Sequence, residues 1–189
     1  MINSHTLLAK WIHWTFIPLY AYGIFKQVDD LSELKDASLL NFEILFAIVF
    51  LIIVLLRYFY MKDTPTLLGA HDDVPKGHLF IAKAVHRLVY FSLIMLPTTG
   101  LLIAGLFSLG MRGVEFAIVI HEFSASLSYV VIALHVGATF YSRFKGEGLW
   151  NAMVPFWQEK GRNSSNFISK LEKIENKTYE KIEDVLDLE

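Results

Sequence analysis

Long apolar stretches alternate with short polar segments four times along most of the chain. They run from about Leu7 to Phe25, about Leu39 to Tyr60, about Leu88 to Met111 and about Phe116 to Ser142. Each is close to the roughly 20 residues that an α-helix needs to cross the hydrocarbon core of a bilayer. The pattern therefore predicts an all-α fold, an integral membrane bundle of four helices.

The first apolar stretch is the least uniform of the four, because it carries Lys10, His13 and Pro18. Proline is tolerated in a spanning helix when neighbouring helices satisfy the freed carbonyl. Residues 1–10 lack the basic region, short apolar core and cleavage site of a removable signal peptide. We therefore expect them to lead directly into the first span.

Composition supports a membrane setting. Apolar residues make up 54% of 189 residues, which is more apolar surface than one soluble core can bury. We expect the lipid bilayer as a partner and no nucleic acid. The chain contains no cysteine, which excludes disulfides, iron–sulfur clusters and covalently attached haem.

Basic residues near the ends of the spans predict the orientation. Three of them, Lys26, Lys35 and Arg112, lie on one side, and eight lie on the other: Lys10, Arg57, Lys62, Lys76, Lys83, Arg87, Arg143 and Lys145. Because positive charge is retained in the cytoplasm, both termini should be cytoplasmic. Residues 26–36 then form an acidic external loop, and residues 62–83 form a cytoplasmic loop rich in turn residues.

Two histidines, His121 and His135, share the fourth apolar stretch. Fourteen residues at 100° each leave their side chains about 40° apart, with a rise of roughly 21 Å between them. Ionisable residues inside a span are candidates for function, and two at opposite depths suggest two stacked cofactors. Haem iron is the obvious occupant, since histidine is its usual axial ligand. Alternatively, both histidines are polar packing residues between helices.

Depth in the membrane sorts the other polar residues. His13 lies early in the first span, at the cytoplasmic level of His135, so these two can face one site. The residue at the external level of His121 is Glu43, near the start of the second span.

These residues lie in short motifs that resemble the bacterial cytochrome b561 family, which is related to the cytochrome b subunits of nickel–iron hydrogenases and formate dehydrogenases. The resemblance covers roughly residues 5 to 145. The motifs are Trp11-Ile12-His13-Trp14, His86-Arg87-Leu88-Val89-Tyr90, Leu96-Pro97-Thr98-Thr99-Gly100, His121-Glu122 and Tyr129-Val130-Val131-Ile132-Ala133-Leu134-His135. The resemblance implies a four-span protein that holds two b-type haems and exchanges electrons with the quinone pool.

The resemblance also implies a ligand set. His13 and His135 would bind the cytoplasmic-side haem, and His121 would bind the external-side haem. The family's fourth ligand is a histidine in the second span, and the matching position here is Glu43. Either Glu43 contacts the iron directly or through water, or that iron is five-coordinate, or the second haem is absent. The chain is thus expected to hold one or two haem b groups.

Other histidines are assigned smaller roles. His86, with Arg87 beside it, is expected to contact a haem propionate or a quinone. The alternative is that His86 lies at the membrane boundary with its hydrogen bonds satisfied and has no role in binding. We expect His5, His71 and His78 to be solvated side chains in flanking or loop segments.

Residues 146–189 form a separate C-terminal region beyond the haem-binding domain of residues 1–145. Its first part carries Trp150, Phe156 and Trp157 and suits the membrane interface. From Ser164 to Glu189 the pattern predicts an amphipathic cytoplasmic helix, with Ser164 and Ser165 as possible caps. Four lysines against seven acids favour a protein partner or self-association over anionic lipid. A solvated, partly frayed tail is the alternative.

Taken together, the sequence predicts a b-type cytochrome of the bacterial inner membrane. It would transfer electrons between a quinone pool and a redox partner protein, and homo-oligomerisation is an alternative to that partner. Two other functions remain open: a stand-alone superoxide:quinone oxidoreductase, and a membrane interaction or transport protein without haem.

Overall fold

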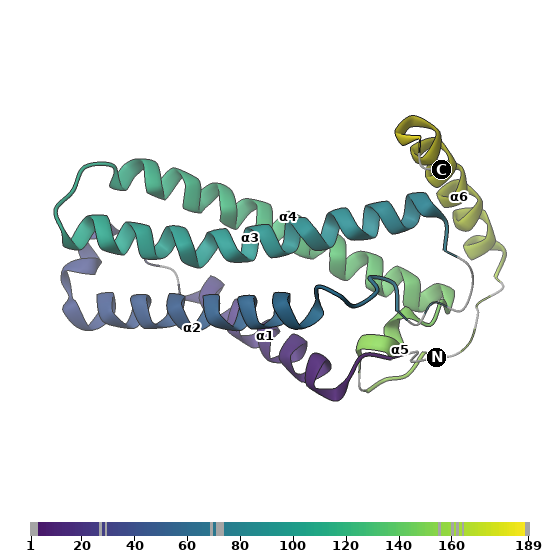
Figure 1. Cartoon of the computed structure of the whole chain (residues 1–189), viewed down its shortest axis with the longest axis horizontal. Coiled ribbons are helices and arrows are strands. Elements are labelled where there is room, and N and C mark those ends of the chain that lie inside the picture. Colours follow the sequence, from purple (N-terminus) through teal and green to yellow (C-terminus); the bar gives the residue numbers. More distant parts are fainter. Residues whose placement is uncertain are drawn as a thin grey trace. The chain divides into compact units, whose positions relative to one another are not determined.

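Helices make up the secondary structure of this protein (Figure 1). The computed structural model describes residues 4–26, 28, 30–68, 70, 74–154, 156–159, 161, 163 and 165–187, and no strand occurs among them. The predicted all-α fold class is therefore confirmed. In chain order the elements are α1 (Leu7–Phe25), the short 3-10 helix η1 (Leu31–Lys35), α2 (Ala37–Met61), α3 (Lys76–Ser108), α4 (Val114–Lys145), α5 (Leu149–Met153) and α6 (Asn166–Leu186).

Three of the described helices, α2, α3 and α4, are long and apolar enough to cross a membrane. Helix α1 has the predicted bounds but is not among these three. Its 19 residues include Lys10 and His13, which lower the mean hydropathy of a short helix. That α1 spans the membrane therefore stays a prediction.

Helix α3 corrects the predicted cytoplasmic loop of residues 62–83. It begins at Lys76, just after Pro75, and extends for 33 residues, about 50 Å. The prediction started this helix at Leu88 because charged residues precede it. Charge excludes a segment from hydrocarbon but does not stop a helix, so α3 simply continues beyond the apolar part. His78, His86 and Arg87 consequently lie on a helix.

The predicted external loop, residues 26–36, contains the helix η1. Asp30 caps it by accepting a hydrogen bond of 2.6 Å from the Ser32 N–H, and Glu33 reaches back to the Asp30 N–H at 3.2 Å. Asp36 then caps α2 by accepting the Ser38 N–H at 2.8 Å. The acidic residues of this loop therefore also have a local structural use, because side-chain oxygens satisfy the free N–H groups at helix starts.

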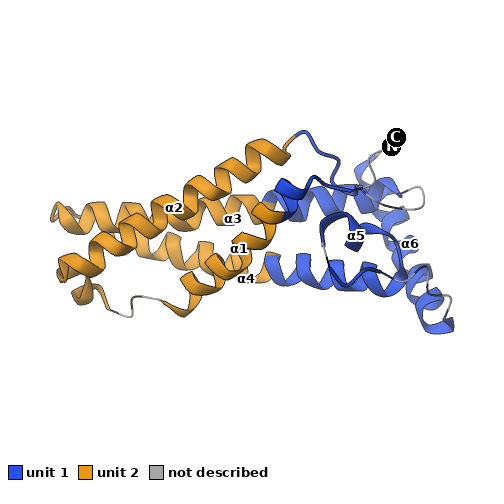
Figure 2. Ribbon diagram, turned by 90° about the horizontal axis from the view of Figure 1, so that it is seen from below, with its two compact units in different colours: residues 1–10, 63–87, 132–189 blue, residues 11–62, 88–131 orange. Residues whose placement is uncertain are grey.

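The chain divides into two compact units (Figure 2). Unit 1 comprises residues 1–10, 63–87 and 132–189, and unit 2 comprises residues 11–62 and 88–131. Helices α1, α3 and α4 each contribute one part to unit 1 and another part to unit 2.

Unit 2 consists of parts of α1, α2, α3 and α4 that contact one another in a closed ring. Aromatic rings join α1 to α2 and α2 to α3, and hydrogen bonds join α3 to α4 and α4 back to α1. The contacts are Phe16–Phe50 at 4.8 Å between ring centroids, Tyr58–Tyr90 at 5.3 Å, Thr99–His121 at 2.8 Å and Tyr20–Ser128 at 2.6 Å.

The fully buried side chains of unit 2 are small, and several of its large apolar side chains are exposed. Among the described residues, the largest fully buried side chains are Val54, Ser92, Ser124 and Ser128. By contrast, Phe25, Phe116 and Phe123 are 89%, 70% and 63% exposed. Lipid tails are as apolar as these rings, so a bilayer removes the cost that water would impose on them.

Unit 1 holds the start of α1 against α5. The Lys10 ammonium donates to the Asn151 carbonyl at 3.3 Å, and the His5 N–H donates to the Ala152 carbonyl at 3.1 Å. Trp150 of α5 is buried and donates its indole N–H to the Trp157 carbonyl at 2.9 Å. Part of the aromatic segment predicted for the membrane interface therefore packs inside this unit.

Helix α6 lies in the C-terminal tail. Ser165 caps it by accepting the Ile168 N–H at 3.3 Å, whereas Ser164 lies outside the described residues. Ile168 is buried within unit 1. The tail therefore has a docking surface on its own chain.

The hydrogen bond between Tyr20 and Ser128 gives a test of the contact between α1 and α4. Ser128 donates its own hydrogen to the Ala125 carbonyl at 2.7 Å, so its oxygen accepts the Tyr20 hydroxyl. Ser128→Ala leaves the Tyr20 hydroxyl unpaired in an apolar interior and should cost about 1–3 kcal/mol. Tyr20→Phe should cost less, about 1 kcal/mol, because the Ser128 hydroxyl keeps its partner. Thermal unfolding in detergent measures both, and a larger loss for Tyr20→Phe would contradict this arrangement.

Candidate functional site

Helix α4 carries His121 and His135 without interruption from Val114 to Lys145. The helical register assumed for these two histidines is therefore present: about 21 Å of rise separates them, on nearly the same face. His121 belongs to unit 2 and His135 belongs to unit 1.

His121 is held by Thr99 of α3. The Thr99 hydroxyl donates its single hydrogen to backbone carbonyls, at 2.7 Å to Met95 and 3.0 Å to Leu96. Its oxygen lies 2.8 Å from Nδ1 of His121 and can accept the Nδ1–H while its own hydrogen points to those carbonyls. In a neutral imidazole this leaves Nε2 without a proton, which is the form that binds a metal. Gly100 faces the same ring, and a Cβ there would lie 3.7 Å from its Cε1 atom.

Glu43 is paired with Lys26. The Lys26 ammonium lies 2.5 Å from Oε1 of Glu43 and 3.9 Å from the centre of the Phe42 ring. The two charged side chains are 33% and 24% exposed. The carboxylate thus already has a cationic partner at the end of α1.

His13 contacts Arg57 of α2 through its Nδ1 atom. Arg57 also donates its Nε–H to the Tyr90 hydroxyl of α3 at 3.1 Å. A guanidinium only donates hydrogen bonds, so Nδ1 of His13 accepts and a neutral ring carries its proton on Nε2. Arg57 must therefore release Nδ1 before Nε2 of His13 can bind a metal.

His86 and His135 lie together in unit 1. Their ring centroids are 5.0 Å apart and their planes are 76° apart, an edge-to-face arrangement. Nδ1 of His86 lies 2.7 Å from the Ala82 carbonyl, which can only accept, so Nδ1 carries the hydrogen. Nε2 of a neutral His86 is consequently unprotonated. Arg87, the next residue, has an exposed side chain.

The predicted site residues thus fall into separate groups. Unit 1 brings His86 and His135 together, and unit 2 contains His13, His121 and Glu43. The predicted pairing of His13 with His135 joins the two units and stays a prediction, as does the pairing of His121 with Glu43.

Three partners in the site went unpredicted. They are Thr99, Lys26 and the contact of Arg57 with His13. Thr99 lies in a motif quoted for the family resemblance, which was its only signal. His78 was predicted to be solvated, but its ring stacks on Tyr179 at 4.9 Å, because α3 and not a loop carries it. His71 lies outside the described residues.

The residues around His121 fit a haem. Nδ1 of the ring contacts the Thr99 hydroxyl, as a second partner usually contacts a metal-binding histidine, and Gly100 faces the ring. His13 can bind a haem iron only if Arg57 moves away from its Nδ1 atom.

Comparison with known proteins gives one match. Neither a curated protein nor a solved structure matches the chain. The family model described as prokaryotic cytochrome b561 matches residues 4–156, which include His13, Glu43, His121 and His135. The matched segment is most of the chain, and the family consists of membrane electron-transfer proteins that bind b-type haem. The chain therefore belongs to the prokaryotic cytochrome b561 family.

Proposed function

We propose that this protein is a cytochrome of the bacterial inner membrane that transfers electrons between a quinone pool and a redox partner protein. In this proposal α1 to α4 form a four-helix bundle across the membrane, and both termini lie in the cytoplasm. The observation that carries the proposal is the contact between Nδ1 of His121 and the Thr99 hydroxyl at 2.8 Å, because a ring that donates its Nδ1–H there can offer Nε2 to iron. Such second partners fix the orientation of metal-binding histidines.

In the proposed cytoplasmic-side site, His13 and His135 would hold the haem iron. Haem supplies a one-electron centre there, and the protein tunes it by ligand identity, hydrogen bonding and burial. Arg57 is a cation beside His13. A charged guanidinium forms strong hydrogen bonds with a carboxylate such as a haem propionate. Such a bond would compensate Arg57 for losing its contact with Nδ1 of His13.

His86 is the proposed quinone contact beside this site, with Arg87 next to it. Its Nδ1–H is bound to the Ala82 carbonyl, which fixes the orientation of the ring. The ring also touches that of His135, which would put a quinone contact next to an axial ligand.

The proposed external-side site is abnormal. His121 offers one nitrogen, but the second-span position carries Glu43, which Lys26 holds in an ion pair of 2.5 Å. A carboxylate is a harder ligand than imidazole, and this one is already stabilised by an ammonium. We therefore propose that the chain binds either one haem, or a second haem that is high-spin and open to small ligands.

The first test of this proposal removes the histidines of the cytoplasmic-side site. His135→Ala and His13→Ala should each abolish a low-spin b-type centre, since low-spin iron needs both strong axial ligands. Haem content and optical spectra of the purified protein measure the loss. His5→Ala is the matched control and should leave both unchanged. Wild-type spectra and full haem content in both variants would refute the assignment.

The second test converts the external-side site. Glu43→His, combined with Lys26→Gln to remove the unpaired cation, should raise the low-spin signal toward two centres per chain. Electron paramagnetic resonance of the oxidised protein follows the change, and Lys26→Gln alone is the control. If wild-type protein already has two bis-histidine centres that persist in Glu43→Ala, another residue supplies the missing ligand.

The third test concerns orientation. Eight of the eleven basic residues near the predicted span ends were assigned to one side, so C-terminal reporter fusions should be active only as cytoplasmic reporters. A fusion that is active outside the cytoplasm would reverse the assignment of both haem sites and of the quinone to their membrane faces.

A further inference from the structure

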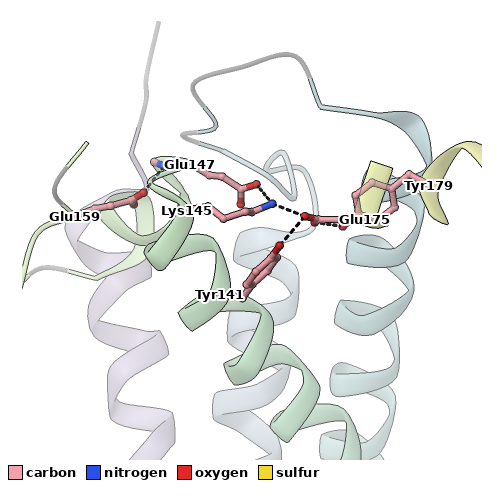
Figure 3. Close-up of polar contacts among 7 residues, drawn as sticks. Tyr141, Lys145, Glu147, Glu159, Glu175 and Tyr179 are labelled. Carbon is pink, nitrogen blue, oxygen red and sulfur yellow. Dashed lines mark hydrogen bonds and ion pairs between the residues drawn. The ribbon is translucent and has the colours of Figure 1, made fainter. Parts of the chain in front are cut away.

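One face of α6 carries three residues, Glu175, Tyr179 and Glu183, spaced four residues apart. Residues at this spacing lie in a row along a helix. Figure 3 shows the first two at the end of α4, where dashed lines join Glu175 to Lys145, Tyr141 and Tyr179. All the contacts of this row described below lie within unit 1.

The first anchor joins α6 to the end of α4. The Lys145 ammonium lies 2.7 Å from Oε2 of Glu175 and also contacts Oε1 of Glu147. The Lys145 side chain is only 5% exposed. Tyr141 donates its hydroxyl to Oε2 of Glu175 at 3.2 Å, and Tyr179 donates to Oε1 at 2.6 Å. A lysine this deeply buried needs its carboxylate partners, because an unpaired charge is costly to remove from water.

The charge state of Glu175 supports this anchor. Burial alone would raise the pKa of its carboxyl group, but hydrogen bonds from Lys145, Tyr179 and Tyr141 outweigh burial and leave the pKa below its ordinary value of 4.5. Glu175 is therefore ionised at neutral pH, as the pairing with Lys145 requires.

The second anchor joins α6 to the start of α3. Oε1 of Glu183 accepts the Gly77 N–H at 2.6 Å, and this N–H is one of the free donors in the first turn of α3. The ring of Tyr179 stacks on His78 at 4.9 Å with 6° between the planes. A Cβ at residue 77 would lie 2.6 Å from the Tyr179 carbonyl oxygen, so only glycine permits this approach.

The two anchors lie at similar distances from the histidine pair. Gly77 precedes His86 by nine residues of α3, and Lys145 follows His135 by ten residues of α4. At 1.5 Å per residue these lengths are about 14 Å and 15 Å. Because helices are stiff over such lengths, a change in spacing between the anchored ends changes the spacing between His86 and His135.

We propose that α6 is a brace that ties the start of α3 to the end of α4 and thereby positions His86 against His135. Lys145, Glu175 and Glu183 are positioning residues in this arrangement. The family match ends at residue 156, so the brace lies outside the matched segment. The inference rests on the proposed function in one respect, that His135 binds haem.

The test uses the full-length, haem-loaded protein and three variants. Lys145→Met removes the α4 anchor, Glu183→Ala removes the α3 anchor, and Lys145→Arg keeps the positive charge. Glu180→Gln is the matched control, since Glu180 is exposed on the same helix. The readouts are the midpoint potential and the paramagnetic resonance g values of the centre that His135→Ala abolishes.

Each single-anchor loss should shift the potential and g values of that centre, or remove its haem, while any His121 centre is unchanged. Lys145→Arg and Glu180→Gln should match the wild type. Hydrogen exchange confirms that α6 is released in the two anchor variants. If α6 is released and the His135 centre keeps its wild-type potential and g values, the brace is refuted. Wild-type protein without a His135-dependent centre would refute the proposed function instead.

Glu183→Ala also keeps the test decisive if Lys145→Met fails to fold, because it leaves no buried charge unpaired. A shift in Glu183→Ala alone supports the brace, and its absence with α6 released overturns it.

Discussion

The hydrocarbon interior of a bilayer offers no water, so every polar group inside it must find a partner within the protein. In unit 2 this constraint explains the main polar contacts. Ser128 accepts the Tyr20 hydroxyl at 2.6 Å and joins α4 to α1. The Thr99 hydroxyl lies 2.8 Å from Nδ1 of His121, and this contact joins α3 to α4. The same bonds that satisfy polar groups thus also hold the helices together and set which ring nitrogen of His121 is free for a metal.

The start of α2 shows how a charged residue changes this arrangement. Glu43 occupies the position at which the family resemblance implies a histidine, and a carboxylate there needs a cation. Lys26, directly after α1, supplies it at 2.5 Å. The pair is partly exposed, as expected for charges close to the membrane boundary. The carboxylate is engaged in an ion pair, which is the physical reason to propose an abnormal second site.

Hydropathy predicted the helices well where apolar residues alone define them. The bounds of α1 agree with the prediction, and α2 begins two residues earlier than predicted. Helix α3 begins 12 residues before the predicted span, since hydropathy marks where a helix enters lipid and not where it begins. Periodicity likewise predicted α6 as a helix. Periodicity could not predict that α6 packs against α3 and α4. The net charge of −3 treats Glu175 and Glu183 as unpaired acids, whereas both have partners within the chain.

The histidines of the candidate site were predictable from spacing, but their hydrogen-bond partners were not. A helical period gives the face on which His121 and His135 lie. It does not give the rotation of a neighbouring helix, and that rotation decides whether Thr99 meets His121 or Arg57 meets His13. These partners determine the protonated nitrogen of each ring, so the chemistry of the site depends on contacts between helices.

The central claim is that this cytochrome has one bis-histidine haem and one site that lacks a second histidine. The most direct measurement is haem per polypeptide, by pyridine haemochrome assay, together with the paramagnetic resonance spectrum of the same oxidised wild-type sample. The account predicts one low-spin centre per chain, with either no further haem or a high-spin signal. Two low-spin bis-histidine centres per chain, or a colourless protein, would contradict it.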